Sequence, residues 1–138
     1  MSETDGLQMV ERLVEATNAH DLDALVSCFD EDYENETPVH PGRGFRGRDQ
    51  VRTNWEQIFA FVPDVRAQVV RSVVDGERVW TEWEMTGTRR DGSPHHLRGV
   101  IIFRVIGETA RWARFYLEPV DDQASDVDHA VRDQVVRS

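Results

Sequence analysis

Residues 79–117, VWTEWEMTGTRRDGSPHHLRGVIIFRVIGETARWARFYL, decide the fold of this chain. They contain three extended segments, at 79–88, 97–106 and 109–117, whose alternating pattern is typical of strands in one curved antiparallel sheet. The first segment carries tryptophans on both of its faces and glutamates on only one. Whether that glutamate face points toward the core or toward solvent therefore decides where a functional site can lie.

Two short turns suggest how these strands pair. Asp75-Gly76 ends an alternating segment that begins at Val65, and Gly107-Glu108 has the same two-residue form. The first turn predicts one shared face for Val65, Ala67, Val69, Arg71, Trp80, Glu82, Glu84 and Thr86. The second predicts that Phe103 faces Trp112, Ile101 faces Arg114 and Gly99 faces Tyr116. A β-bulge within 65–88 would exchange the faces, and the loop predicted at 89–96 is too long to fix the register between the hairpins.

The N-terminal half is expected to be mostly helical. Apolar spacing predicts helices over about 6–18, over 22–29 and over about 48–62, with Asp21 capping the second and Thr4 or Asp5 capping the first. A short strand is expected at 33–38. Residues 38–47 hold two prolines and three glycines and are expected to be a loop.

The C-terminal tail contains Val127, Val131 and Val135 at helical spacing. This spacing favours a short amphipathic helix at about 126–136, whose narrow apolar stripe would need a surface to cover. A disordered acidic tail is the alternative.

Composition indicates one globular domain. The chain has 138 residues, of which 39% are hydrophobic and 30% are charged, enough for an ordinary core. No apolar run approaches the ~20 residues of a membrane span, and the N-terminus lacks the features of a secretory signal, so a cytoplasmic location is expected. A net charge of −10 would repel a phosphate backbone, so neither nucleic acid nor membrane is an expected partner.

The metal-binding residue types do not form a recognisable site. Cys28 is the single cysteine, which excludes an intrachain disulfide and favours a buried, inert thiol. The side chains of the adjacent His95 and His96 would diverge on a strand. We therefore expect no metal and no cofactor.

The order helix, helix, strand, helix and four meandering strands resembles the nuclear transport factor 2-like cone fold, in particular its SnoaL-like branch of polyketide cyclases. The likeness rests on NAHDLDALVSCFDEDY at 18–33, GRDQVRTNW at 47–55, Pro63-Asp64, WEMTGT at 83–88 and ARFYLE at 113–118. The resemblance implies an α+β fold, with a curved mixed or antiparallel sheet wrapped around three N-terminal-half helices and a central apolar pocket. It implies a cone domain at 1–120, followed by an extension at 121–138.

The resemblance also assigns roles to residues that would line that pocket. Glu118 or Glu84 would transfer a proton, and Arg114 with Tyr116 would hold a developing oxyanion. The other binding candidates are Trp112, Glu82, Trp80, Ile101, Phe103, Asn54, Thr37 and His40. Two alternatives stay open: Glu82 and Glu84 could face solvent, and Arg114 and Glu118 could form an ordinary surface ion pair.

Ketosteroid isomerases of this fold use a tyrosine and two aspartates, and at those positions this chain has Leu13, Thr37 and Ile101. Their mechanism is therefore disfavoured. SnoaL-like cyclases carry an aspartate where this chain has Glu118. The resemblance implies a cofactor-free cyclase, isomerase or dehydratase acting on an apolar polyketide-, steroid- or terpenoid-like ligand. The alternatives are a non-catalytic binding protein that uses the same pocket and a purely structural interaction domain.

The outer face of the sheet is expected to be too apolar for open solvent. On the register above it would carry Trp83, Met85, Val100, Ile102, Phe115 and Leu117. We therefore expect a homodimer formed through this outer face.

Overall fold

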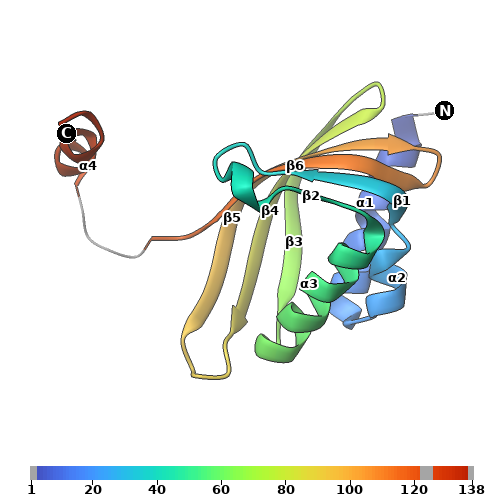
Figure 1. Cartoon of the computed structure of the whole chain (residues 1–138), viewed down its shortest axis with the longest axis horizontal. Coiled ribbons are helices and arrows are strands. Elements are labelled where there is room, and N and C mark those ends of the chain that lie inside the picture. Colours follow the sequence, from blue (N-terminus) through green and yellow to red (C-terminus); the bar gives the residue numbers. More distant parts are fainter. Residues whose placement is uncertain (1–2, 122–125, 137–138) are drawn as a thin grey trace.

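The computed structural model describes residues 3–121 and 126–136 and shows three helices on the concave side of one curled, unclosed sheet (Figure 1). Its elements are α1 (Glu3–Ala19), α2 (Leu22–Val26), β1 (Phe29–Glu36), the 3₁₀ turn η1 (Pro41–Arg43), β2 (Phe45–Arg46), α3 (Arg48–Phe61), β3 (Arg66–Asp75), β4 (Arg78–Thr88), β5 (Pro94–Ile106), β6 (Thr109–Pro119) and α4 (Val127–Val135). The strand order is β2-β1-β6-β5-β4-β3. Only β1 and β6 pair in parallel among these strands, so the predicted α+β class with a mixed sheet is confirmed.

The first two helices form where they were predicted, with different ends. The Asp21 carboxylate accepts a hydrogen bond from the Ala24 amide at 3.1 Å, which confirms it as the cap of α2. Thr4 and Asp5 lie inside α1, so neither caps it. The second helix was predicted too long: the Cys28 carbonyl accepts from the Ala110 amide, and this bond draws Phe29 into β1.

The segment 38–47 is only partly a loop. It contains η1 and the two-residue strand β2, which pairs with β1 through Glu34 with Arg46 and Asn35 with Phe45. Phe45 makes an edge contact with the ring of Tyr33. This contact anchors the segment to the core, while α3 begins and ends close to its predicted bounds.

The first hairpin differs from the predicted register. Its turn is Gly76-Glu77, with Asp75 opposite Arg78. Val70 is an extra residue between the pairs Val69 with Trp83 and Arg71 with Glu82. Because such a bulge reverses the alternation, Ala67 and Val69 lie on the opposite face from Arg71.

The second hairpin has the predicted turn, with Ile106 opposite Thr109, but it also contains a bulge. Arg111 is extra, because Val105 pairs with Ala110 whereas Arg104 pairs with Trp112. Beyond it, Phe103 faces Ala113 and Ile101 faces Phe115, so the predicted pairs with Trp112 and Arg114 are wrong.

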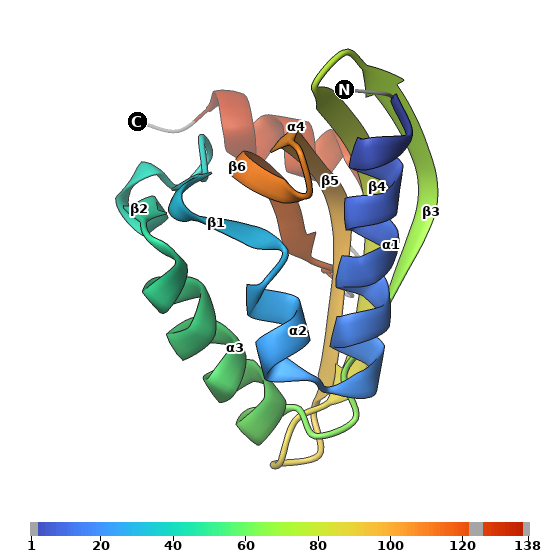
Figure 2. The same ribbon diagram turned by 90° about the vertical axis from the view of Figure 1, so that its right-hand side faces the viewer.

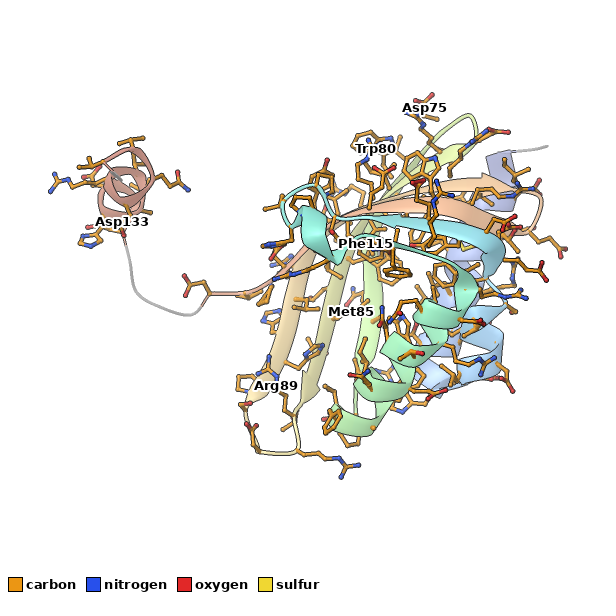
Figure 3. The ribbon with its side chains drawn as sticks, in the orientation of Figure 1. Asp75, Trp80, Met85, Arg89, Phe115 and Asp133 are labelled. Atoms are coloured by element: carbon orange, nitrogen blue, oxygen red, sulfur yellow. The ribbon has the colours of Figure 1, made fainter. Side chains whose placement is uncertain are left out.

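These registers settle which side chains face the helices. Val79 and Phe103 are opposite each other, are almost fully buried and belong to one core cluster with Met9 and Leu13 of α1. The odd-numbered residues of β4 therefore face the concave side of the sheet, and its even-numbered residues face the convex side. Figure 3 shows Met85 and Phe115 on the side of the helices and Trp80 on the other.

Curvature of the sheet depends on Gly99 in β5. Its φ of 151° is unfavourable for residues with a side chain, and a Cβ at this position would lie 2.0 Å from the Tyr116 carbonyl oxygen. The missing side chain lets β6 approach β5 closely, opposite Trp83 and Leu117. Figure 2 shows the resulting trough with α1, α2 and α3 together on one side.

The predicted C-terminal helix is present as α4, capped by Asp126, whose side chain accepts from the His129 amide at 2.8 Å. It stands clear of the sheet in Figure 1, and every residue from 126 to 136 is exposed. In the described part of the chain, none of the helices combines the length and apolar character that a membrane crossing requires.

Candidate functional site

The predicted site residues do not converge on the concave side. Seven of them lie on the convex face: Trp80, Glu82, Glu84, Trp112, Arg114, Tyr116 and Glu118. The prediction that they line the helix-covered face is wrong, because the bulges at Val70 and Arg111 change the alternation of β3 and β6. Ile101 and Phe103 do face inward, but they are 2% and 1% exposed and belong to the packed core.

Glu84 and Glu118 belong to a charged cluster at one end of the convex face. A Glu84 oxygen lies 2.7 Å from His96 Nε2 and 3.9 Å from Arg98 Nε. A Glu118 oxygen lies 2.8 Å from His40 Nε2, in an ion-pair contact without hydrogen-bond alignment. The Glu84 and Glu118 side chains are 29% and 43% exposed, so water reaches both carboxylates.

Arg114 is engaged by its neighbours on the convex face. Its Nε lies 2.9 Å from a Glu36 oxygen on β1, and its guanidinium lies 4.9 Å from the centre of the Trp112 ring. Both contacts hold the guanidinium against the sheet. Arg114 therefore forms an ion pair at the surface, which was the alternative to a role in the pocket, but its partner is Glu36 and not Glu118.

Thr37 adjoins the charged cluster through the backbone of His40, whereas Asn54 lies on α3. The Thr37 hydroxyl donates to the His40 carbonyl at 2.7 Å and so fixes the turn that presents His40. Asn54 on α3 accepts a hydrogen bond from Gln50, one turn earlier. Their predicted binding roles stay predictions.

The concave side carries a separate, apolar surface that remains partly exposed. Trp55 and Phe59 of α3 contact each other, with ring centres 5.5 Å apart. Inward-facing residues of β5 and β6 also pack against the core without being fully covered. We call Trp55, Phe59, Leu97, Phe115 and Leu117 the concave apolar surface.

One titratable side chain shares the inward face of the central strands. Among the described residues of β4, β5 and β6, the inward positions from Val79 to Leu117 hold no carboxylate, and His95 is their one ionisable group. Partial burial and the nearby Arg89 guanidinium lower the pKa of His95, against an opposing effect of Asp64. From the sequence, His95 was considered only as a metal ligand beside His96. Because neighbouring residues of a strand point to opposite faces, one of the two histidines must face the concave side, and that residue is His95.

A second polar pair lies on the inward side of β1. The Tyr33 hydroxyl donates to Asn35 Oδ1 at 2.7 Å, and burial strongly raises the pKa of Tyr33. The Asn35 amide nitrogen has no hydrogen-bond partner among the described residues, which leaves it available to an acceptor oxygen. Composition alone gives no signal for this pair.

Two hollows share no lining residue with the concave apolar surface. One of about 780 Å³ follows α1 and the edge strand β3 and is lined by Leu7, Val10, Glu11, Val14, Glu15, Arg66, Ala67, Gln68, Val69, Ser72, Glu84 and Thr86. The other, of about 520 Å³, lies beside the β1–β2 connection and includes Asn35 and Phe45. Glu84 borders the first, where it is paired with His96 as described above.

No three-residue group of histidine, cysteine, aspartate or glutamate is arranged to hold a metal ion within 3–121 and 126–136. Cys28 is buried, as predicted, and burial raises the pKa of its thiol. Its Sγ lies 3.5 Å from the Ala24 carbonyl oxygen. A raised pKa disfavours the nucleophilic thiolate.

The curled sheet, with three helices on its concave side and a partly exposed apolar surface between them, has the nuclear transport factor 2-like fold. The sequence profile of the SnoaL-like domain matches residues 10–115, and the chain belongs to that family.

Solved structures of similar fold support this assignment. A loop-truncation variant of IdmH is 25% identical, with 82% of this chain and 92% of that chain covered and a TM-score of 0.70. A candidate SnoaL-like polyketide cyclase from Jannaschia is 17% identical, covering 83% and 86%, with a TM-score of 0.71. A candidate isomerase from Bacillus subtilis is 14% identical, covering 86% and 91%, with a TM-score of 0.75. A comparison with curated protein sequences finds no match.

Proposed function

We propose that the protein binds a small apolar molecule at the concave apolar surface. One observation carries the proposal: apolar side chains of α3, β5 and β6 pack against the core from the concave side and stay partly exposed. Covering such side chains stabilises a complex by about 25 cal/mol for each Å² removed from water. Family membership and the names of the Jannaschia and Bacillus relatives support a small organic molecule as the ligand.

Polar groups at the edge of this surface would orient the ligand. The Asn35 amide nitrogen, which has no hydrogen-bond partner among the described residues, is a donor for a carbonyl or hydroxyl oxygen. Neutral His95, favoured by its lowered pKa, can both donate and accept a hydrogen bond. An apolar ligand carrying one or two oxygen atoms, as polyketide-, steroid- and terpenoid-like molecules do, fits this combination.

The second candidate function is cofactor-free isomerisation, cyclisation or dehydration of such a ligand. The half-buried His95 favours it, because its lowered pKa keeps the imidazole neutral, and the neutral ring is the form that can accept a proton from a ligand on the inward face. The earlier candidates Glu118, Arg114 and Glu84 would act only on a ligand bound at the convex face. Their proton-transfer and oxyanion roles stay predictions.

A ligand screen followed by turnover assays tests both functions. Thermal-shift measurements with aromatic polyketide-like and terpenoid compounds are expected to give stabilising hits, and their absence would contradict the binding proposal. Each hit is then incubated with wild-type protein and with His95→Gln, Glu84→Gln and Glu118→Gln. Binding without conversion supports a binding protein. Conversion that is lost only in His95→Gln supports catalysis by His95 at the concave face. Conversion that is lost in Glu84→Gln or Glu118→Gln supports catalysis at the convex face instead.

A further inference from the structure

We propose that the open edge of β3 binds an extended, basic segment of a partner protein, which adds a strand to the sheet beside α1. The proposal does not depend on a ligand at the concave apolar surface. It is also separate from the homodimer predicted through the outer face, of whose six predicted side chains Val100 and Ile102 point outward and the other four point inward. That dimer stays a prediction.

The backbone of β3 forms the outer edge of the sheet, next to β4. In an antiparallel pair, every second residue directs its N–H and C=O away from the neighbouring strand. Ala67 is one of these residues, because Asn18 binds both of its backbone groups. His20 binds the carbonyl of Val65 in a similar way. These contacts close the edge at Val65 and Ala67.

The register extends this pattern along the rest of β3. Val69 lies two residues beyond Ala67, and past the extra residue Val70 the outward positions are Ser72 and Val74. Among the described residues, none forms a hydrogen bond to the outward backbone groups of Val69, Ser72 or Val74. Unpaired groups on an edge are a template for another strand. The edge is therefore open from Val69 to Val74.

The hollow of about 780 Å³ follows this edge and reaches around it to both faces of the sheet. It is lined on the concave side by Leu7, Val10 and Val14 of α1, and on the convex side by Gln68 and Thr86. Figure 2 shows β3 at the outer margin of the sheet beside α1. Because a strand points its side chains alternately to its two faces, an added strand would find room for them on both sides of β3.

The charges of the hollow favour a basic segment. Its described lining residues include three carboxylates, Glu11, Glu15 and Glu84, and one guanidinium, Arg66, at the closed end of the edge. Glu84 is already paired with His96. The exposed Glu11 and Glu15 lie one turn apart on α1, with no cation at ion-pair distance among the described residues. A lysine or arginine on the added strand would pair with them, while its apolar neighbours cover the apolar side chains of α1.

Fluorescence anisotropy with the full-length chain tests the proposal, using a labelled peptide of about eight residues in which lysine and valine alternate. The bulge at Val70 interrupts the outer edge, so we expect weak binding, with a dissociation constant of roughly 10–100 μM. Hydrogen exchange should show protection of the amides of Val69, Ser72 and Val74 in the complex.

Two matched peptides separate charge from strand addition. One carries glutamate in place of every lysine. The other keeps the lysines but has proline in place of the central valines, so that it lacks the N–H groups of a strand. Each should bind about tenfold more weakly than the lysine-valine peptide, because main-chain hydrogen bonds and opposite charges both contribute to its affinity.

Two substitutions in the protein locate the site. Ser72→Pro removes an outward N–H that β4 does not use and should weaken binding about tenfold, whereas Ser72→Ala keeps the N–H and should bind like wild type. Glu11→Lys should also weaken binding about tenfold, and Glu56→Lys, a matched change at an exposed position of α3, should not. Circular dichroism checks each fold. If Ser72→Pro does not fold, Glu11→Lys and the proline peptide decide the proposal.

Five results would overturn the proposal. Absence of binding at about 1 mM peptide would mean that the edge stays unpaired. Equal binding of the glutamate peptide would contradict a basic partner, and equal binding of the proline peptide would contradict strand addition. Binding that survives both Ser72→Pro and Glu11→Lys would lie elsewhere on the surface. A dimer of the chain alone that Ser72→Pro abolishes, measured by sedimentation equilibrium, would mean that a second copy occupies the edge.

Discussion

At the scale of single residues, Thr81 shows how this sheet accommodates a buried polar group. Its hydroxyl donates to the Ile101 carbonyl at 2.6 Å and accepts from the Trp83 indole N–H at 2.6 Å. Both Thr81 and Trp83 are 1% exposed, so no water replaces either bond. The Thr81 hydroxyl thus joins β4 to β5 and also provides the hydrogen-bond acceptor for the Trp83 indole N–H.

Thr81→Val should therefore destabilise the protein although it keeps the shape of the side chain. The indole N–H of Trp83 would lose its acceptor, and an unsatisfied buried donor costs about 1–3 kcal/mol. Urea unfolding measures the change in the free energy of unfolding. The matched control Thr86→Val, at an exposed position of the same strand, should stay within about 0.5 kcal/mol of wild type. Equal effects of the two substitutions would contradict the role of the buried bond.

His95 should make stability depend on pH. Its pKa is lowered in the folded state, first by partial burial and then by Arg89, so the unfolded chain binds more protons as pH falls through about 6.5. Stability should fall with pH in that window and level off below the folded pKa. His95→Asn should reduce the loss measured by urea unfolding between pH 7.5 and 5.5. His129→Asn, on exposed α4, serves as the control, and an unchanged slope in His95→Asn would refute this role.

At the scale of elements, Asn18 protects the open edge of the sheet. Its amide donates to the Ala67 carbonyl at 3.0 Å and accepts from the Ala67 amide at 2.7 Å, so it occupies both backbone groups of one residue on β3. β3 is the terminal strand of the sheet. His20 takes the Val65 carbonyl in a similar way, at 2.9 Å. Both contacts hinder edge-to-edge pairing with another chain.

Asn18→Ala should release this edge. Loss of the two hydrogen bonds should lower the free energy of unfolding by about 1–3 kcal/mol, as measured by urea denaturation. Asn18→Asp keeps the acceptor for the Ala67 amide and should fall between Asn18→Ala and wild type. Asn54→Ala on α3 is the matched control. A loss below about 0.5 kcal/mol in Asn18→Ala would show that the edge does not need the amide.

The elements could be predicted from the sequence because their patterns are local. Val51, Trp55 and Phe59 define α3 through helical spacing, and Gly107-Glu108 defines a turn. The bulges at Val70 and Arg111 have no comparable signal, because each is a single extra residue in one strand of a pair and the residues around it keep an ordinary strand pattern. One extra residue in each hairpin was enough to misplace the faces.

At the scale of the whole molecule, the two faces of the sheet differ in character. The convex face is charged and aromatic, whereas the concave face is apolar and is the face at which we propose that a small molecule binds. The family resemblance predicted the correct fold, but it could not tell which side chains face the helices. The alternating pattern around Glu82 and Glu84 is the same whether the two glutamates lie on the convex or on the concave face of the sheet. Most of the predicted site residues were therefore assigned to the wrong face of the sheet, although the fold was predicted correctly.

Adjacent residues on β6 allow the most direct test of the concave binding surface. Leu117 belongs to the concave apolar surface, and its neighbour Tyr116 points to the convex face. The measurement is a calorimetric titration of the best ligand from the screen into Leu117→Gln and Tyr116→Gln, each checked for folding by circular dichroism. The account predicts at least tenfold weaker binding to Leu117→Gln and unchanged binding to Tyr116→Gln. The reverse pattern would contradict it.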